Sequence, residues 1–389
     1  YEIPKRDWSS DVCSSDLQLL RTAVWRMRSI EVIMDGQYGS TGKGLFAGYL
    51  AKLHKPQVLA CALSPNAGHT LILEDGTKLV HKMLPLGIVS PDLQTIVLGP
   101  GSLIDPDALL YEIQQAEQFG LLPNHVRILA HQSAAMVLCR HRDAESDGGT
   151  APGSTRKGVG AAQIERIQRR PDDNNIIGLM QPIHPIFDRI ELVSTAELQQ
   201  IYLEASRIQV EGCQGYSLSI YHGQYPYVTC RDVTTHSLLA DCGMPYMRWS
   251  AVSVYGVFRT YPIRVANRPA SGEWSGPTYP DSIETTFEAI GQPQELTTVT
   301  QLPRRIFTFS HQQAIEACVQ NRMDYAFLNF AQYCPTWKEL RDIWLRLNEC
   351  TLVSYLGFGP KIDDIVRVGS PSITEEHVKH IYERARAAN

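Results

Sequence analysis

The chain has 389 residues, with 36 Lys and Arg against 41 Asp and Glu, and a formal net charge of −5. A net acidic chain lacks the excess positive charge that neutralises phosphates, which argues against nucleic-acid binding. No stretch approaches about 18 uninterrupted apolar residues, so no transmembrane helix is predicted. The nine cysteines form no Cys-x-x-Cys pair. This pattern is typical of reduced thiols in a cytoplasmic protein.

The N-terminal segment is treated separately from the rest of the chain. Residues 6–17 resemble the translation of a sequencing adapter. Segments of this kind are excluded from arguments about the fold. We therefore predict a non-native or disordered leader at residues 1–26 and a single domain at residues 27–389, with Met27 as the natural start.

The first predicted element is a strand followed by a glycine-rich loop. Residues 30–34 are apolar except for Glu31 and rich in isoleucine and valine, which predicts a buried parallel strand. The loop from Asp35 to Gly44 reads Asp-Gly-Gln-Tyr-Gly-Ser-Thr-Gly-Lys-Gly, and a helical apolar spacing begins at Leu45. Such an arrangement presents backbone amides and a helix N-terminus to an anion, and Lys43 adds a charge. Its spacing fits neither the P-loop nor the dinucleotide fingerprint, so it favours phosphate binding without naming a reaction.

Later segments predict further helices and a second functional motif. Asp105-Pro106 predicts a helix start, with Asp105 as the cap and proline in the first turn. Trp337 and Trp344 recur at helical spacing and indicate a helix that faces the core. Between the loop and these helices, His69 follows Asn66 and Gly68. A histidine in this setting, shortly after a phosphate-type loop, is a candidate general acid.

The order of these motifs resembles the adenylosuccinate synthetase family. The resemblance implies an α/β fold, related to the P-loop proteins, with a mainly parallel central sheet and helical and loop subdomains. It also implies one catalytic domain, a homodimer and Mg²⁺ as the cofactor. The segments that carry the resemblance are 36–44, 66–70, Leu84-Pro85-x-Gly87-Ile88, Gly99-Pro100-Gly101, Asp105-Pro106, 157–160, Val210-Glu211-Gly212-Cys213-Gln214-Gly215, 222–229 and Gly359-Pro360.

The resemblance also implies site residues by position in the motifs. Members of the family phosphorylate the 6-oxygen of a purine nucleotide and then let the amine of L-aspartate displace the phosphate. Cationic and backbone donors should supply most of the catalysis of such a reaction. The implied residues are Ser40, Lys43 and His69 for catalysis; Gly39, Ser40, Thr41, Gly42, Lys43, Gly44, Asn329, Gln332, Gly359 and Pro360 for ATP and its phosphates; Ser40, Asn66, Ala67, Thr155, Arg169 (across the dimer interface), Gln214 and Thr229 for the nucleotide monophosphate; Thr300, Arg304 and Arg305 for aspartate; and Ser40 with the Gly68 carbonyl for Mg²⁺.

Ser40 departs from the family pattern. Other members carry an aspartate there, which takes the purine N1 proton and ligates Mg²⁺. A serine hydroxyl is a poor base near neutral pH. It is also shorter and uncharged, which leaves room for a group on C2, where guanine has an amino group and hypoxanthine has hydrogen. The substitution resembles the phage branch of the family, which adds aspartate to dGMP.

Two further departures agree with that branch. Leu302 stands where bacterial members have an arginine that approaches the ribose 2′-hydroxyl, so it suits a 2′-deoxy substrate. Ala331 stands where the family has an aspartate that accepts hydrogen bonds from the guanine of GTP. Without that acceptor the preference for GTP is relaxed, and we expect ATP or dATP as the donor.

We therefore predict a C–N ligase that joins L-aspartate to the 6-position of dGMP, using ATP and a 6-phosphoryl intermediate. The products are N6-succino-2-amino-2′-deoxyadenylate (a precursor of 2-aminoadenine in DNA), ADP and phosphate. The expected partners are dGMP, L-aspartate, ATP or dATP and a second copy of the chain, without nucleic acid or membrane, in the cytoplasm of a phage-infected host. One alternative is a conventional adenylosuccinate synthetase acting on IMP with GTP, which Ser40 disfavours. The other is a catalytically dead nucleotide-binding regulator, which the retained Lys43, His69 and Arg304 disfavour.

Overall fold

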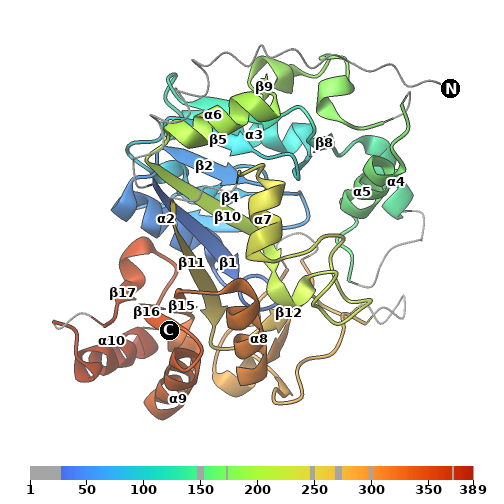
Figure 1. Cartoon of the computed structure of the whole chain (residues 1–389). Helices are drawn as coiled ribbons and strands as arrows, with labels where there is room; N and C mark the ends of the chain where they lie inside the picture. The colour runs from blue at the N-terminus through green and yellow to red at the C-terminus, as the bar shows by residue number, and fades with distance from the viewer. Residues whose placement is uncertain are drawn as a thin grey trace, which may run out of the picture.

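A ten-stranded sheet runs through the middle of the molecule (Figure 1). The computed structural model describes residues 28–146, 153–171, 174–245, 250–267, 274–297, 301–369 and 372–388. The predicted leader lies outside these ranges. In spatial order the strands are β17 (Ile365–Arg367), β16 (Leu352–Gly357), β15 (Tyr325–Asn329), β11 (Ser250–Arg259), β1 (Arg28–Asp35), β10 (Arg207–Gly215), β2 (Val58–Cys61), β5 (Thr95–Leu98), β7 (Arg127–His131) and β9 (Glu191–Val193).

All neighbouring strands of this sheet are parallel except β16 and β17, which are antiparallel. This confirms the predicted α/β class with a mainly parallel sheet. Three small sheets flank it: β12 (Ile263–Arg264), β14 (Arg305–Phe307) and β13 (Glu284–Thr285); β3 (His69–Ile72) and β4 (Lys78–His81); β6 (Leu103–Ile104) and β8 (Ala135–Met136).

Helices α8, α9 and α10 lie near one end of the sheet and α3 and α6 near the other, while α4 and α5 pack on each other at one side (Figure 1). The α-helices are α2 (Lys43–His54), α3 (Pro106–Gln118), α4 (Cys139–Ser146), α5 (Val159–Gln168), α6 (Thr195–Glu204), α7 (Thr235–Asp241), α8 (His311–Asn321), α9 (Trp337–Asn348) and α10 (Glu375–Ala387). The 3-10 helices are η2 (Leu86–Val89), η3 (Ile177–Leu179), η4 (Pro185–Asp188), η5 (Tyr216–Leu218), η7 (Glu288–Ile290), η8 (Ala331–Tyr333) and η9 (Ile362–Asp364).

The local sequence signals produce the predicted elements. Asp105 caps α3 by accepting a hydrogen bond from the amide of Ala108 at 3.1 Å, with Pro106 in the first position of the helix. Trp337 and Trp344 on α9 are partly buried against the core. Helix α2 begins at Lys43, two residues before the predicted start, because Gly42 takes a left-handed conformation (φ 98°) and ends the loop there. Glycine adopts such a conformation at little cost.

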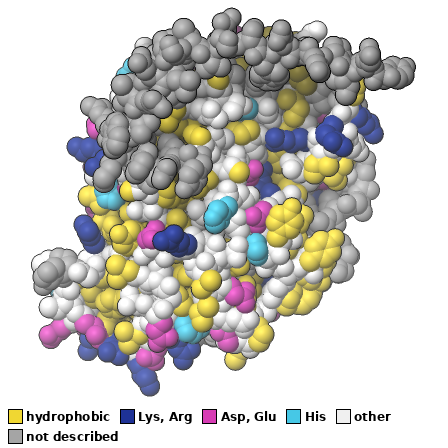
Figure 2. All heavy atoms as spheres, in the orientation of Figure 1, with side chains coloured by type: hydrophobic (Ala, Val, Ile, Leu, Met, Phe, Trp, Pro, Cys, Tyr) yellow, Lys and Arg dark blue, Asp and Glu magenta, His cyan; other side chains and the backbone are white. Residues whose placement is uncertain are grey.

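Two surface features bear on partners. Among the described residues, no helix combines the length and hydropathy that crossing a bilayer requires. On the face drawn in Figure 2, basic side chains are scattered among acidic, histidine and apolar ones, and its described part shows no continuous basic surface. Binding to a nucleic-acid backbone generally requires such a surface.

Candidate active site

The carboxyl ends of five adjacent parallel strands bring the predicted site segments together. Strand β1 pairs with β10, where Asp35 lies opposite Gly215, and with β11, where Asp35 lies opposite Val257. Strands β15 and β16 continue the same parallel array and end at Asn329 and Gly357. Ligands of open α/β sheets bind at this edge. The glycine-rich loop (residues 35–44) and the predicted ATP-binding residue Asn329 therefore lie on the same side of the molecule.

The glycine-rich loop is shaped for an anion. Gly39, Ser40 and Gly42 have positive φ angles of 94°, 55° and 98°. The backbone amides of residues 40–44 donate to no acceptor among the described residues, and the last two of these residues form the start of α2. Asn329 closes one side of the loop, because its side-chain amide donates to the Thr41 carbonyl at 3.1 Å. A free row of amides at a helix N-terminus is a phosphate-binding arrangement.

Lys43 and Asp35 form a buried ion pair beneath this loop. The Lys43 ammonium lies 3.1 Å from Asp35 Oδ2, and the two side chains are 4% and 0% exposed. Thr41 donates its hydroxyl to the same carboxylate oxygen at 2.6 Å. Asp35 is the first residue of the glycine-rich loop, and no role was predicted for it from the sequence.

His69 sits between two acceptors. It is 7% exposed at the start of β3, and its Nδ1 bonds to the carboxylate of Glu211. Its Nε2 lies 3.3 Å from the Cys213 carbonyl. The second Glu211 oxygen accepts from the amide of Leu86 at 2.8 Å. Three motifs that are far apart in the sequence therefore meet at His69, and both of its ring nitrogens face oxygen atoms of the protein.

Asn66 and Gln214 meet next to His69. The Gln214 amide nitrogen donates to Asn66 Oδ1 at 2.9 Å, and the Ser64 hydroxyl donates to the same oxygen at 2.8 Å. Gln214 is 6% exposed, and its Oε1 accepts no hydrogen bond within the described structure. Buried acceptors of this kind are rarely left unpaired, so Gln214 is placed to accept a donor group from a bound ligand.

The predicted aspartate-binding segment reaches the glycine-rich loop through Arg304. Its Nη1 donates to the Ser40 hydroxyl at 2.7 Å, and its Nε donates to the Leu296 carbonyl at 2.9 Å. Burial lowers the pKa of Arg304 to about 10, with Glu295 acting in the opposite direction, so the side chain is cationic at neutral pH. Glu295 also accepts from Arg259, which is fully buried and stacks on the Phe330 ring.

The family model for adenylosuccinate synthetase matches residues 32–182 and 172–341. The chain belongs to the adenylosuccinate synthetase family. It is 53% identical over 362 residues to the N6-succino-2-amino-2′-deoxyadenylate synthase of cyanophage S-2L, covering 93% of this chain and 98% of the relative. It is 30% identical over 243 residues to the adenylosuccinate synthetase of Pyrococcus horikoshii, covering 61% and 67%. A solved structure of the cyanophage S-2L succinoaminodeoxyadenylate synthetase, bound to dGMP and dATP as an energy donor, matches with a TM-score of 0.87 and covers 93% of this chain and 100% of that one.

These similarities confirm the predicted family and its phage branch. The remaining predicted residues lie on several other segments. Gln332 is buried in η8 next to Asn329, and Gly359 and Pro360 follow β16. Ala67 and Gly68 are half-buried between Asn66 and His69, and Thr229 bonds through its amide to Leu218 at 2.7 Å.

Other predicted residues are not joined to the loop in the described structure. Thr155 precedes α5, and Arg169 is exposed at its C-terminal end with a φ of 53°. Arg305 is used within the chain, since it pairs with both oxygens of Glu284 at 2.8 and 2.6 Å and donates to the Gly276 carbonyl at 2.7 Å. Thr300 lies outside the described residues. The roles assigned to these four residues, like those of the other predicted site residues, stay predictions.

Sequence reasoning gave no role to Asp35, Glu211, Arg259 or Glu295. Asp35 lies in the motif 35–44 and Glu211 in the motif 210–215, so the motifs indicated the correct segments. Their roles depend on pairing across the fold: Glu211 is 142 positions from His69 in the chain, and Glu295 is 36 from Arg259. No local periodicity reports such contacts.

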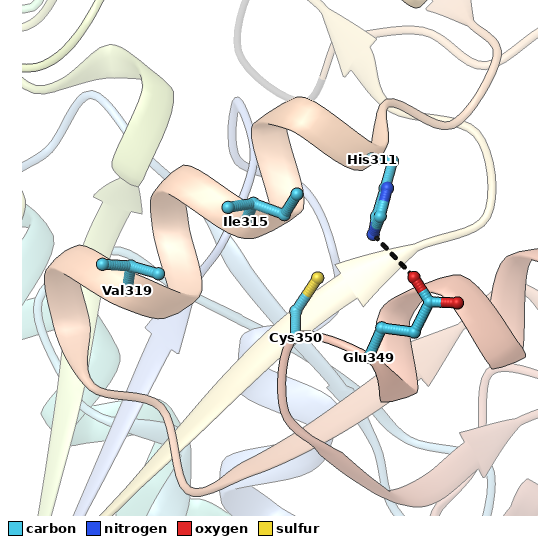
Figure 3. Close-up of a pocket in the computed structure, with 5 residues that line it drawn as sticks. All are labelled: His311, Ile315, Val319, Glu349 and Cys350. Atoms are coloured by element: carbon cyan, nitrogen blue, oxygen red, sulfur yellow. Dashed lines mark ion pairs between the residues drawn. The ribbon is translucent and has the colours of Figure 1, made fainter.

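A surface pocket of about 350 Å³ lies between α8 and the end of α9 (Figure 3). His311, Ile315 and Val319 of α8 face Glu349 and Cys350 across it, with His311 Nε2 3.6 Å from Glu349 Oε2. None of the predicted site residues lines this pocket. The candidate site at the carboxyl edge of the sheet is therefore a different region.

His81 carries a prediction about acid stability. It lies directly opposite His69 in the β3–β4 pair and is fully buried. Burial lowers the pKa of His81 from 6.5 to about 4, with Glu211 acting in the opposite direction. Because the folded-state pKa lies below the unfolded one, His81 costs stability as pH falls from about 6.5 towards 4. At pH 5 we expect a loss of about 2 kcal/mol from this residue.

The test is His81→Phe, which keeps a planar ring and cannot titrate. Urea unfolding at pH 7.5 and pH 5 should show that the fall in unfolding free energy is about 2 kcal/mol smaller in the variant than in the wild type. An equal fall in both proteins would contradict the buried, neutral state of His81.

Proposed function

We propose that this chain ligates L-aspartate to the 6-position of dGMP, with ATP or dATP as the phosphoryl donor. The products would be N6-succino-2-amino-2′-deoxyadenylate, ADP or dADP, and phosphate. The observation that carries the proposal is Ser40, a neutral side chain at the loop position where the family has a carboxylate. The cyanophage synthase, which is 53% identical to this chain, was solved with dGMP and dATP, the two substrates that the sequence predicts.

The groups at the carboxyl edge of the sheet suit the two steps of this reaction. In the first step, the 6-oxygen of the purine attacks the terminal phosphorus of the triphosphate, the diphosphate leaves, and the proton on the purine N1 would pass to water. The loop amides and Lys43 would stabilise the charge on the transferring phosphoryl group. In the second step, the amine of aspartate attacks C6 and phosphate leaves. His69 would hold a proton at the 6-oxygen, and Arg304 would bind a carboxylate of the incoming aspartate.

The nucleotide would be held by Asn66 and Gln214, whose paired amides lie beside His69. The free Gln214 Oε1 can accept a hydrogen bond from a purine N–H. Asp35 does not replace the missing loop carboxylate as a base, because it is fully buried and its two oxygens already accept from four donors. Asp35 therefore places no carboxylate on the Ser40 side of the loop, where a C2 amino group needs room.

The protein oxygens at the site fit a Mg²⁺ ion that is held mainly by phosphate oxygens of the bound nucleotide. Among the described residues, no three His, Cys, Asp or Glu side chains gather as a metal site. Mg²⁺ commonly takes only one or two protein oxygens, with phosphates and water completing its shell. The Ser40 hydroxyl and the Gly68 carbonyl would supply these, and the ion would neutralise charge on the triphosphate.

The donor site favours adenine over guanine nucleotides. Ala331 is fully buried and offers no acceptor to a guanine base. Asn329 is also committed, since its amide nitrogen bonds Thr41 and its oxygen accepts from the Phe330 amide at 2.9 Å. A site without the aspartate acceptor loses the basis for rejecting ATP.

A homodimer and a cytoplasmic location belong to the same proposal. Helix α5 exposes Ile164 and Ile167, which are 60% and 63% exposed, beside Arg169. The neighbouring segment, joined to α5 by the Asn175 bond to the Ala162 carbonyl, exposes Leu179 at 72%. Apolar side chains clustered in this way mark interaction surfaces. A second copy on this face would bring Arg169 to the nucleotide bound by that copy. The dimer would act in the cytoplasm of an infected host cell.

A substrate matrix tests the proposal. The full chain is incubated with Mg²⁺, L-aspartate, dGMP or IMP, and ATP, dATP or GTP, and the product is followed by mass. We expect succinylated dGMP with ATP or dATP. Turnover of IMP alone would instead establish a conventional synthetase. Nucleotide binding without any turnover would establish the inactive regulator.

A further inference from the structure

Asp35 lies beneath the glycine-rich loop and accepts hydrogen bonds from it with both carboxylate oxygens. It is the last residue of β1, which is hydrogen-bonded on both sides, to β10 and to β11. The side chain is 0% exposed. The central strand therefore fixes the position of this carboxylate before any ligand arrives, and a buried charge in such a place needs partners.

Four donors of the loop converge on the two oxygens. Oδ1 accepts from the amides of Gln37 at 2.9 Å and Gly39 at 3.1 Å. Oδ2 accepts from the Thr41 hydroxyl at 2.6 Å and the Lys43 ammonium at 3.1 Å. Every alternate residue of the segment 37–43 is thus bonded to the same carboxylate. The bonds fold the segment around Asp35 into a single turn.

This arrangement divides the donors of the loop into two sets. The amides of residues 37 and 39 point inward to Asp35, while those of residues 40–44 donate to no described acceptor. The Lys43 ammonium has three donor positions. One of them bonds Asp35, and two remain. The carboxylate thereby holds the turn in the shape that leaves the outward donors for phosphate.

We propose that Asp35 is a positioning residue for phosphoryl transfer, which sets Lys43 and the loop amides in their phosphate-binding geometry before the triphosphate binds. The inference rests on the proposed function for its substrate and adds a residue that acts through Lys43. Preorganised donors stabilise charge without reorganising during the reaction. An amide at this position could not substitute, because its NH₂ group would face donors.

The experiment is a double-mutant cycle on Asp35→Asn and Lys43→Met. Binding of the non-hydrolysable ATP analogue AMP-PNP with Mg²⁺ is measured by calorimetry on the full chain, together with dGMP binding. We expect Asp35→Asn to weaken AMP-PNP at least about tenfold and to change dGMP binding less than about threefold. In the Lys43→Met background, Asp35→Asn should cost less than about twofold, because the partner through which it acts is already gone.

Asp75→Asn is the matched control. Asp75 accepts from the amide and the hydroxyl of Thr77, both at 2.9 Å, in the exposed turn between β3 and β4. It is a similar turn without a lysine, and its loss should leave kcat and every KM unchanged. Independent, additive effects of the two substitutions on AMP-PNP would overturn the proposal. So would unchanged binding by Asp35→Asn, or a wild-type chain that does not bind AMP-PNP.

If Asp35→Asn does not fold, Thr41→Val tests the positioning role instead. It removes one donor and leaves the ion pair, so it should raise the KM for ATP at least about threefold while the KM for dGMP stays constant. An unchanged KM for ATP would reject the positioning role. The binding measurements need no turnover, so a wild type that binds AMP-PNP and ligates nothing would reject the proposed function alone.

Discussion

His69→Ala is expected to lower kcat by about 10²- to 10⁴-fold, the range that a positioned general acid contributes. The buried ring bonds Glu211 through Nδ1 and lies 3.3 Å from the Cys213 carbonyl through Nε2. Alanine removes the proton donor and leaves Glu211 without its partner. Because Asn66 and Gln214 remain, the dissociation constant of dGMP measured by calorimetry should change far less than kcat.

Glu211→Gln tests whether the negative charge next to His69, and not only the imidazole ring itself, contributes to turnover. Glutamine keeps the shape and can still bond His69, but it removes the negative charge that favours an imidazolium. We expect a kcat between that of the wild type and that of His69→Ala. His81→Phe, across the β3–β4 pair, is the matched control and should leave kcat unaffected. Near-normal turnover by His69→Ala would remove His69 from the acid role.

The sequence predicted the segments of this site better than the bonds within it. The glycine-rich loop was predictable because glycines at 39 and 42, a lysine and a following helix form a contiguous pattern. The family motifs implied that His69 and Gln214 belong to the same site, with different roles. The pairing of His69 with Glu211 was not implied, because it depends on the register of β10 against β1 and on the path of the chain after β2.

The two adjacent arginines also show that the sequence predicted which segments form the site but not which side chains bond to each other. Arg304 and Arg305 are indistinguishable in the sequence, and both were predicted to bind aspartate. In the structure Arg305 begins β14, and its side chain is held by Glu284, which lies in the neighbouring strand β13. Arg304 precedes the strand and turns to Ser40. One step along the chain changes the direction of a side chain near a strand, and only tertiary structure shows which arginine meets the loop.

Ser40→Asp is expected to reverse the preference for the nucleotide monophosphate. We expect kcat/KM for dGMP to fall at least about tenfold and turnover of IMP to appear, measured with ATP and saturating aspartate. The carboxylate would occupy the room beside C2 that the guanine amino group needs, and it would restore a base near N1 for hypoxanthine. Ser40 is exposed on the outer side of the loop, where Arg304 Nη1 donates to its hydroxyl at 2.7 Å.

The same contact gives Ser40→Asp a second effect. A carboxylate at this position would form an ion pair with Arg304, which would compete with the carboxylate of the substrate aspartate, so the KM for aspartate should rise. Ser40→Ala is the matched control: it keeps the space, loses the hydroxyl and should retain the preference for dGMP over IMP. If Ser40→Asp used dGMP as well as the wild type does, Ser40 would not be the residue that admits the C2 amino group. A rise in the KM for aspartate without loss of dGMP would assign Ser40 to the aspartate site instead.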